Sequence, residues 1–140
     1  MLHIQKCGVI IIHEKDDIKR YLIVYSKKSA KYGFPKGGRE KSEPIDTTAE
    51  RELYEETGYR IQIENFEWNT LSNFRIKNNF YFIIELQNDL HQYVIDEGIQ
   101  DTNEILYKKW MTMEELIKLP INKKNFGLNH YIKSLNKNMS

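Results

Sequence analysis

The segment AERELYEETG, from Ala49 to Gly58, constrains this chain more than any other. On a helical wheel, Glu52, Glu55 and Glu56 fall within an arc of about 100°. Glu52 and Glu56 are a like-charge pair one turn apart, and Glu55 and Glu56 sit near the helix C-terminus, where the helix dipole disfavours negative charge. A hard divalent cation such as Mg²⁺ would resolve this conflict, because it takes carboxylate oxygens as ligands. The alternative is a solvated acidic face.

The loop before this helix, GFPKGGREKSEP from Gly33 to Pro44, predicts a partner for that acidic face. Its glycines allow a tight backbone turn that can aim carbonyls or amides at an ion or a phosphate. Basic residues cluster in and before the loop, and they would meet an anion beside a metal; the alternative is a solvated basic face. The cluster consists of Lys27, Lys28, Lys31, Lys36, Arg39 and Lys41. Loop and helix together predict one site for a phosphorylated substrate and its metal.

Hydrophobic periodicity along the rest of the chain predicts a mixture of strands and helices. The expected strands are Cys7–His13, Arg20–Ser26, Tyr59–Trp68, Asn78–Leu86 and Glu104–Trp110. The expected helices are Thr48–Thr57, Thr112–Leu119 and Phe126–Lys137, the first two with T-x-x-E capping boxes, and Gly58 is expected to end the first. The first two strands should form a hairpin. This order indicates an α+β or α/β/α sandwich fold.

The bulk properties narrow the functional class. A length of 140 residues suits a single domain over 1–140, and a net charge of +1 gives no global field for nucleic-acid or membrane binding. Cys7 is the single cysteine, so no intrachain disulfide can form, which fits a reducing compartment. The apolar run that follows it is too short to span a membrane or to form a signal segment. We therefore expect an intracellular, cytoplasmic protein; its oligomeric state is not indicated.

The glycine loop and the acidic helix resemble the signature of the Nudix hydrolases, G-x5-E-x7-R-E-U-x-E-E-x-G-U, in which U is a bulky apolar residue. The final U position is Tyr59, which is aromatic rather than aliphatic, a departure that should affect only packing. The resemblance covers Gly37 to Tyr59, and it implies an α/β/α sandwich with a mixed central sheet. The matching residues are Gly37, Glu43, Arg51, Glu52, Leu53, Glu55, Glu56, Gly58 and Tyr59.

The resemblance also implies an activity: metal-dependent cleavage of a diphosphate linkage, with Mg²⁺ or Mn²⁺ as cofactor. It implies metal ligands at Glu52, Glu55 and Glu56, with the backbone carbonyl of Lys36 as a further candidate. Glu43 and Arg51 would form a salt bridge that braces the loop against the helix. The general base is expected to be Glu52, or alternatively Glu104, and Glu40 is a further candidate near the metal.

The substrate is open at this level. PKGGREKSEP, Pro35 to Pro44, resembles the loop of diphosphoinositol polyphosphate and diadenosine polyphosphate hydrolases, which favours a phosphate-rich small molecule. The expected binding rim is Lys27, Lys28, Lys36, Arg39 and Lys41. Alternatives are hydrolysis of capped RNA, as in mRNA decapping enzymes, house-cleaning of nucleoside triphosphates, and a catalytically silent nucleotide-binding module. Tyr81 and Tyr131 are candidates for stacking on a base, with core packing as the alternative.

Overall fold

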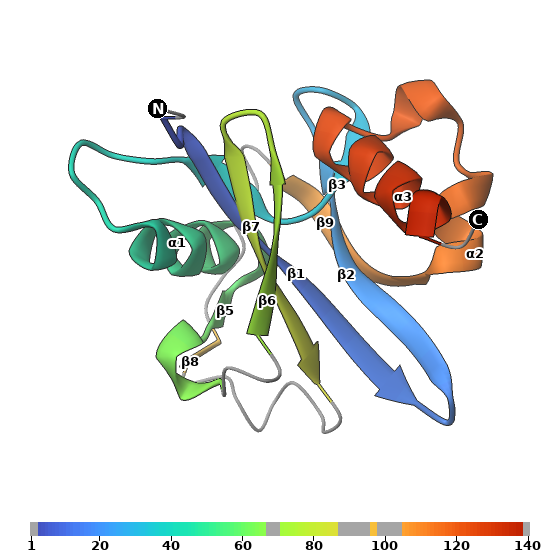
Figure 1. The fold of residues 1–140 in the computed structure, drawn as a ribbon, viewed down its shortest axis with the longest axis horizontal. Coiled ribbons are helices and arrows are strands. Elements are labelled where there is room, and N and C mark those ends of the chain that lie inside the picture. Colours follow the sequence, from blue (N-terminus) through green and yellow to red (C-terminus); the bar gives the residue numbers. More distant parts are fainter. Residues whose placement is uncertain (1–2, 67–70, 87–95, 98–104, 139–140) are drawn as a thin grey trace.

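The computed structural model describes residues 3–66, 71–86, 96–97 and 105–138. Within them, seven strands form one mixed sheet: β1 (Lys6–Lys15), β2 (Ile18–Ser26), β3 (Lys31–Gly33), β4 (Lys36–Gly38), β6 (Leu71–Ile76), β7 (Asn79–Leu86) and β9 (Ile105–Thr112). Helix α1 (Ile45–Thr57) covers one face, and α2 (Met113–Lys118) and α3 (Phe126–Asn138) cover the other (Figure 1). The expected α/β/α sandwich with a mixed central sheet is confirmed.

Strand β1 is the centre of the sheet. It pairs antiparallel with β2 and with β4, and parallel with β7. Its apolar run is buried on both faces, which explains why it reads as continuous rather than alternating. Val9 and Ile11 pack with Leu53 of α1, whereas Ile10 and Ile12 pack with Leu128 of α3. The hairpin of β1 and β2 agrees with the sequence prediction.

The ends of α1 agree with the sequence only in part. Gly58 ends the helix as expected, with φ of 82° and its N–H bonded to the carbonyl of Tyr54. The predicted start is wrong, because the helix begins at Ile45 after Pro44 and has no side-chain cap there. The predicted box of Thr47 and Glu50 does not form. The Glu50 carboxylate instead accepts the backbone N–H of Ile63 at 2.7 Å, which ties the helix to the segment that follows it.

The segment after α1 is the other departure. A strand over Tyr59–Trp68 was expected, but only β5 (Tyr59–Arg60) is extended with a partner, β8 (Asp96–Glu97), and a 3₁₀ turn follows at Ile63–Asn65. Residues 67–70 lie outside the described part. Tyr59, Ile61 and Ile63 are all buried in the core under α1. The alternation of apolar and polar residues therefore reflects burial of one side of this segment, and a segment without a paired strand can show the same alternation as a strand.

The C-terminal elements follow the expected pattern. The capping box of Thr112 and Glu115 is present at the start of α2, and α3 begins at Phe126 as expected. A further 3₁₀ turn, Ile121–Lys123, connects the two helices. Strand β6 and the short strands β3, β4 and β8 were not predicted. No helix in the described part of the chain is long and apolar enough to cross a membrane.

Candidate active site

Helix α1 presents its acidic residues to the short strand β4. Ala49 and Leu53 lie beside this acidic arc on the helix and are buried in the core, which fixes the direction in which the glutamates point. Glu52 and Glu56 are largely buried, 7% and 8% exposed, whereas Glu55 is exposed. Burial of two carboxylates is costly unless cations or hydrogen bonds compensate it, so their surroundings decide what this helix face can bind.

Arg51 supplies one such cation, and it joins the loop to the helix. Its Nε and Nη2 donate to the two carboxylate oxygens of Glu43, each at 3.0 Å, and Nη2 also donates to the carbonyl of Gly38 at 2.8 Å. Its Nη1 donates to Glu52 at 2.8 Å and to Glu55 at 3.3 Å. Hydrogen bonds from Arg51 lower the pKa of Glu43 to about 2, and those to Glu43 raise the pKa of Arg51. The expected brace between Glu43 and Arg51 is therefore present in the geometry.

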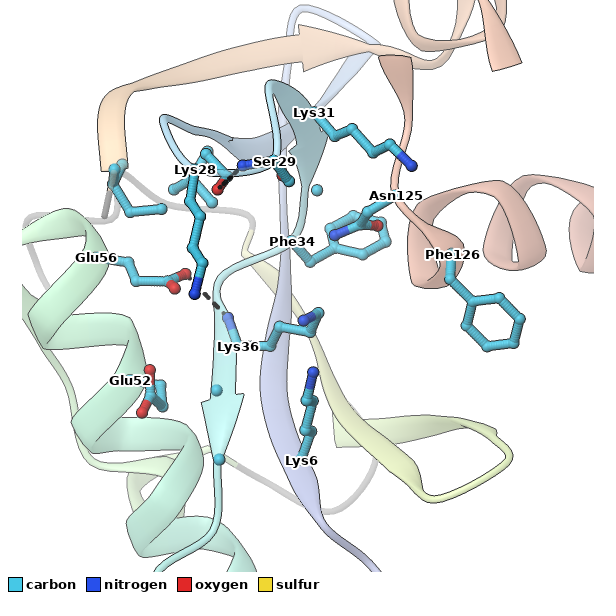
Figure 2. A pocket seen from close by; sticks show the side chains of 16 residues that line it. Lys6, Lys28, Ser29, Lys31, Phe34, Lys36, Glu52, Glu56, Asn125 and Phe126 are labelled. Carbon is cyan, nitrogen blue, oxygen red and sulfur yellow. Dashed lines mark hydrogen bonds between the residues drawn. The ribbon is translucent and has the colours of Figure 1, made fainter. Parts of the chain in front are cut away.

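The glycine loop lies directly against these acids. The α-carbon of Gly37 faces the Glu52 carboxylate, and a Cβ at this position would overlap with it. The neighbouring backbone N–H of Lys36 donates to Oε1 of Glu56 at 3.1 Å (Figure 2). Glycine at position 37 therefore gives the Glu52 carboxylate room to lie against the loop, and it has no left-handed backbone conformation to accommodate.

A pocket of about 710 Å³ opens between β4, the β2–β3 turn and the start of α3. Glu52 and Glu56 lie on one side of it, and lysine side chains project into it from the other elements (Figure 2). The lysines are Lys6, Lys28, Lys31 and Lys36. Burial and the nearby Lys6 ammonium lower the pKa of Lys36, while Glu56 and Glu52 oppose that shift. The pocket therefore combines hard anionic ligands with several cations.

The structure gathers only part of the predicted basic rim. Lys28 and Lys36 line the pocket, and Lys27 lies in the exposed β2–β3 turn without lining it. Arg39 and Lys41 line a separate cavity, together with His3, Ile4, Gln5, Glu40 and Ser42. Side chains alternate along an extended strand, so Arg39 points to the other side of the sheet from Lys36. Glu40 also lines that separate cavity of Arg39 and Lys41, away from Glu52 and Glu56, and Glu104 lies outside the described residues.

Sequence reasoning missed several lining residues. Lys6, which was not considered, lines the pocket because β1 pairs with β4. Lys31 was named in the basic cluster but not in the expected binding rim, and it lines the pocket because β3 folds back on β2. Asn125 and Phe126 enter from the start of α3, and Phe126 is 41% exposed. The nearest signal in the sequence was for Lys6, which directly precedes the buried strand. Tyr81 and Tyr131, considered for base stacking, are instead buried in the core on the α3 side of the sheet.

The donor chemistry at α1 fits a hard divalent cation. Carboxylate and backbone carbonyl oxygens are the ligands such ions prefer. Glu52, Glu56 and the strand carrying Lys36 meet at Gly37, where the missing side chain leaves the space, here called the Gly37 cradle, that the Glu52 carboxylate occupies. Within the described residues, no three acidic, histidine or cysteine side chains are already arranged around one point. Nη1 of Arg51, which does not line the pocket, instead contacts both Glu52 and Glu55. A bound cation would compete with this guanidinium for Glu52 and Glu55.

Comparison with known proteins agrees with this geometry. The family model described as NUDIX domain matches residues 4–132. A crystal structure of a C. elegans Ap4A hydrolase binary complex aligns with a TM-score of 0.61 and 17% identity, covering 97% of each chain. The NUDIX domain of Shewanella oneidensis NrtR complexed with ADP ribose aligns with a TM-score of 0.64 and 12% identity, covering 100% of this chain and 90% of that one. A MutT protein from Methanosarcina mazei aligns with a TM-score of 0.61 and 16% identity, covering 99% of this chain and 96% of that one. No curated protein matches the sequence.

Proposed function

Because the chain belongs to the Nudix family and is a pyrophosphohydrolase, we propose that its substrates are phosphate-rich small molecules. Dinucleoside polyphosphates such as diadenosine tetraphosphate are the first candidates, and diphosphoinositol polyphosphates are the second. The observation that carries this proposal is the pocket itself, in which two helix carboxylates face four lysines. A substrate with a single diphosphate would leave part of that positive charge without a counter-ion.

The exposed ring of Phe126 favours the nucleoside-bearing candidate. It lies at the edge of the pocket opposite Glu52 and Glu56, where its side chain is 41% exposed (Figure 2). A flat base can stack on such a ring, whereas an inositol ring has no π-face to offer. The C. elegans Ap4A hydrolase, which shares the fold over its whole length, acts on a substrate of the first kind. The inositol candidate is supported by the loop sequence and the lysines alone.

The metal requirement belongs to the same proposal. Nudix hydrolases generally use divalent cations, and Mg²⁺ or Mn²⁺ would be held here by Glu52, Glu55, Glu56 and the carbonyl of Lys36. When bound, the ion would neutralise the diphosphate oxygens and lower the pKa of a water. The lysine ammonium groups would bind and orient the phosphates through charge-assisted hydrogen bonds. Glu52, or Glu104 as second candidate, would accept the proton of the attacking water.

A panel of substrates tests the proposal. The purified protein is incubated with Mg²⁺ or Mn²⁺ and, in parallel, diadenosine tetraphosphate, a diphosphoinositol polyphosphate, cap-labelled RNA and nucleoside triphosphates. Faster turnover of the first is the expected result, with mononucleotides as products. Preferential release of the methylated cap nucleotide would instead indicate a decapping enzyme. Binding of nucleotides without turnover of any substrate would contradict the proposal and indicate a silent module.

A further inference from the structure

A second cavity, of about 390 Å³, adjoins the active-site pocket on the α3 side of the sheet. The two share Lys6, Lys36, Asn125 and Phe126 in their walls. The second cavity adds the turn between β6 and β7, and it has no acidic residue among its described lining residues. The added residues are Gln5, Lys77, Asn78, Asn79 and Gly127. Because of the shared walls, one extended ligand can lie in both cavities.

Sheet register explains why two of the lysines lie at the junction. Gly8 of β1 pairs with Lys36, and Lys6, two residues away on β1, pairs with Gly38, so both lysines lie on the same face of the sheet. A Cβ on Gly8 would lie 2.7 Å from the Cβ of Lys36, which is too close. The absent side chain at Gly8 therefore makes the room in which Lys36 lies beside Lys6.

Lys77 adds a third cation from the β6–β7 turn. Its Nζ lies over the ring of Phe126, 5.0 Å from the centroid, and both residues line the cavity. The turn is fastened to β1, because the backbone N–H of Gln5 donates to the carbonyl of Asn78 at 2.8 Å and the Asn78 amide donates to Gln5 Oε1 at 2.7 Å. These hydrogen bonds hold the backbone of the turn that carries Lys77 beside the start of β1, which carries Lys6.

Three ammonium groups around a cavity without a carboxylate create a positive potential that an anion relieves. Lys6 and Lys36 also line the pocket of Glu52 and Glu56, but Lys77 does not, so its ammonium group lies beyond the site of cleavage. We propose that the second cavity is a distal phosphate subsite, in which Lys6, Lys36 and Lys77 bind a phosphate beyond the cleaved linkage. This inference rests on the proposed function, and it makes polyphosphate length the property that the enzyme selects.

The test compares a long and a short anion. Binding of inorganic tetrapolyphosphate and of pyrophosphate is measured by calorimetry, with divalent metal chelated, for the wild type, Lys77→Asn and Lys15→Asn. Lys77 has φ of 54°, a left-handed conformation that asparagine tolerates, so Lys77→Asn removes the charge without straining the turn. Lys15 is an exposed lysine at the other end of β1, so Lys15→Asn is a control with the same charge change.

We expect Lys77→Asn to weaken tetrapolyphosphate binding roughly tenfold, the size of one lost charge-assisted hydrogen bond, and to leave pyrophosphate binding unchanged. Lys15→Asn should change neither. Equal losses for both anions, or no loss for the long one, would overturn the subsite. Should Lys77→Asn lower the melting temperature, Lys77→Gly provides the second variant, because glycine also adopts the left-handed conformation, and the same selective loss is expected.

This binding test is independent of catalysis. If the wild type turns over no substrate, but Lys77→Asn still binds tetrapolyphosphate more weakly than the wild type does, the proposed function is refuted and the subsite is retained. If the wild type cleaves diadenosine tetraphosphate and Lys77→Asn has the same KM, the proposed function is retained and the subsite is refuted. An active enzyme that uses the subsite should instead show a KM for diadenosine tetraphosphate raised roughly tenfold in Lys77→Asn, with kcat nearly unchanged.

Discussion

Arg51 holds both carboxylate oxygens of Glu43, with Nε–Oε2 and Nη2–Oε1 distances of 3.0 Å each. This two-point geometry matches the planar guanidinium and is the strong form of an arginine–carboxylate pair. It fixes the loop of Gly37 and Gly38 against α1, since the same guanidinium also holds the carbonyl of Gly38. One side chain that does not line the pocket therefore holds together the loop and the helix of the candidate active site.

Replacing this guanidinium by an ammonium should cost stability. Arg51→Lys keeps the charge but loses the two-point pair and the bond to Gly38, so we expect a loss of about 1–3 kcal/mol in the free energy of unfolding. Urea denaturation measures it. Arg75→Lys, at an exposed position of β6, is the matched control and should change little. Equal stability of Arg51→Lys and the wild type would show that the brace contributes nothing.

The low pKa of Glu43 predicts acid sensitivity. Its pKa is about 2 in the folded protein against an ordinary value of 4.5, so the ionised form is favoured by folding. The stabilisation is therefore fully present above pH 4.5 and is lost as the pH falls toward 2. Glu43→Gln lacks this contribution. The difference in unfolding free energy between wild type and Glu43→Gln should shrink across that window in urea titrations, and a pH-independent difference would contradict the assignment.

Two adjacent glycines offer a matched pair of variants. A Cβ at Gly37 would overlap with the Glu52 carboxylate, whereas a Cβ at Gly38 would meet nothing within 4 Å. We expect Gly37→Ala to displace the carboxylate and weaken Mn²⁺ binding at least tenfold, roughly the loss of one positioned ligand. Gly38→Ala should bind Mn²⁺ like the wild type. Electron paramagnetic resonance of free Mn²⁺ measures both, and similar affinities for the two variants would refute the role of the cradle.

Gly58 tests the end of α1. With φ of 82° it occupies the left-handed region, where a Cβ costs roughly 1–2 kcal/mol. Gly58→Ala should lower the melting temperature, and Gly58→Asn should lower it less, because asparagine tolerates this conformation. Thermal unfolding followed by circular dichroism compares the two. A larger loss for asparagine than for alanine would show that packing, not backbone conformation, requires glycine here.

The features that the sequence predicted correctly are those that depend on interactions between residues close together in the chain. The acidic face of α1 and its end at Gly58 depend on neighbours within a few residues, and both were readable. The predicted cap at Thr47 was wrong because the helix begins about a turn earlier, after Pro44. The carboxylate of Glu50, which was expected to complete the cap, accepts the backbone N–H of Ile63 instead. Local propensity was outweighed there by a contact made in the folded chain.

Contacts between strands that are far apart in the sequence could not be predicted either. Lys6 and Lys77 are distant in sequence, and only the register of β1 against β7 brings them to one cavity. Arg39 looked equivalent to Lys36 in a cluster of basic residues, yet strand alternation directs it to another cavity. The charge composition of a loop therefore predicts that a basic site exists, but the sheet decides which lysines belong to it.

Metal-dependent hydrolysis at Glu56 is the measurement that tests the central claim most directly. Release of nucleotide from diadenosine tetraphosphate is followed with Mg²⁺ and with chelator, for the wild type, Glu56→Gln and the control Glu114→Gln, which alters an exposed residue of α2. We predict turnover that needs the metal, falls at least about a hundredfold in Glu56→Gln and is unchanged in Glu114→Gln. Equal turnover by Glu56→Gln and the wild type would contradict the assignment of this pocket as the active site.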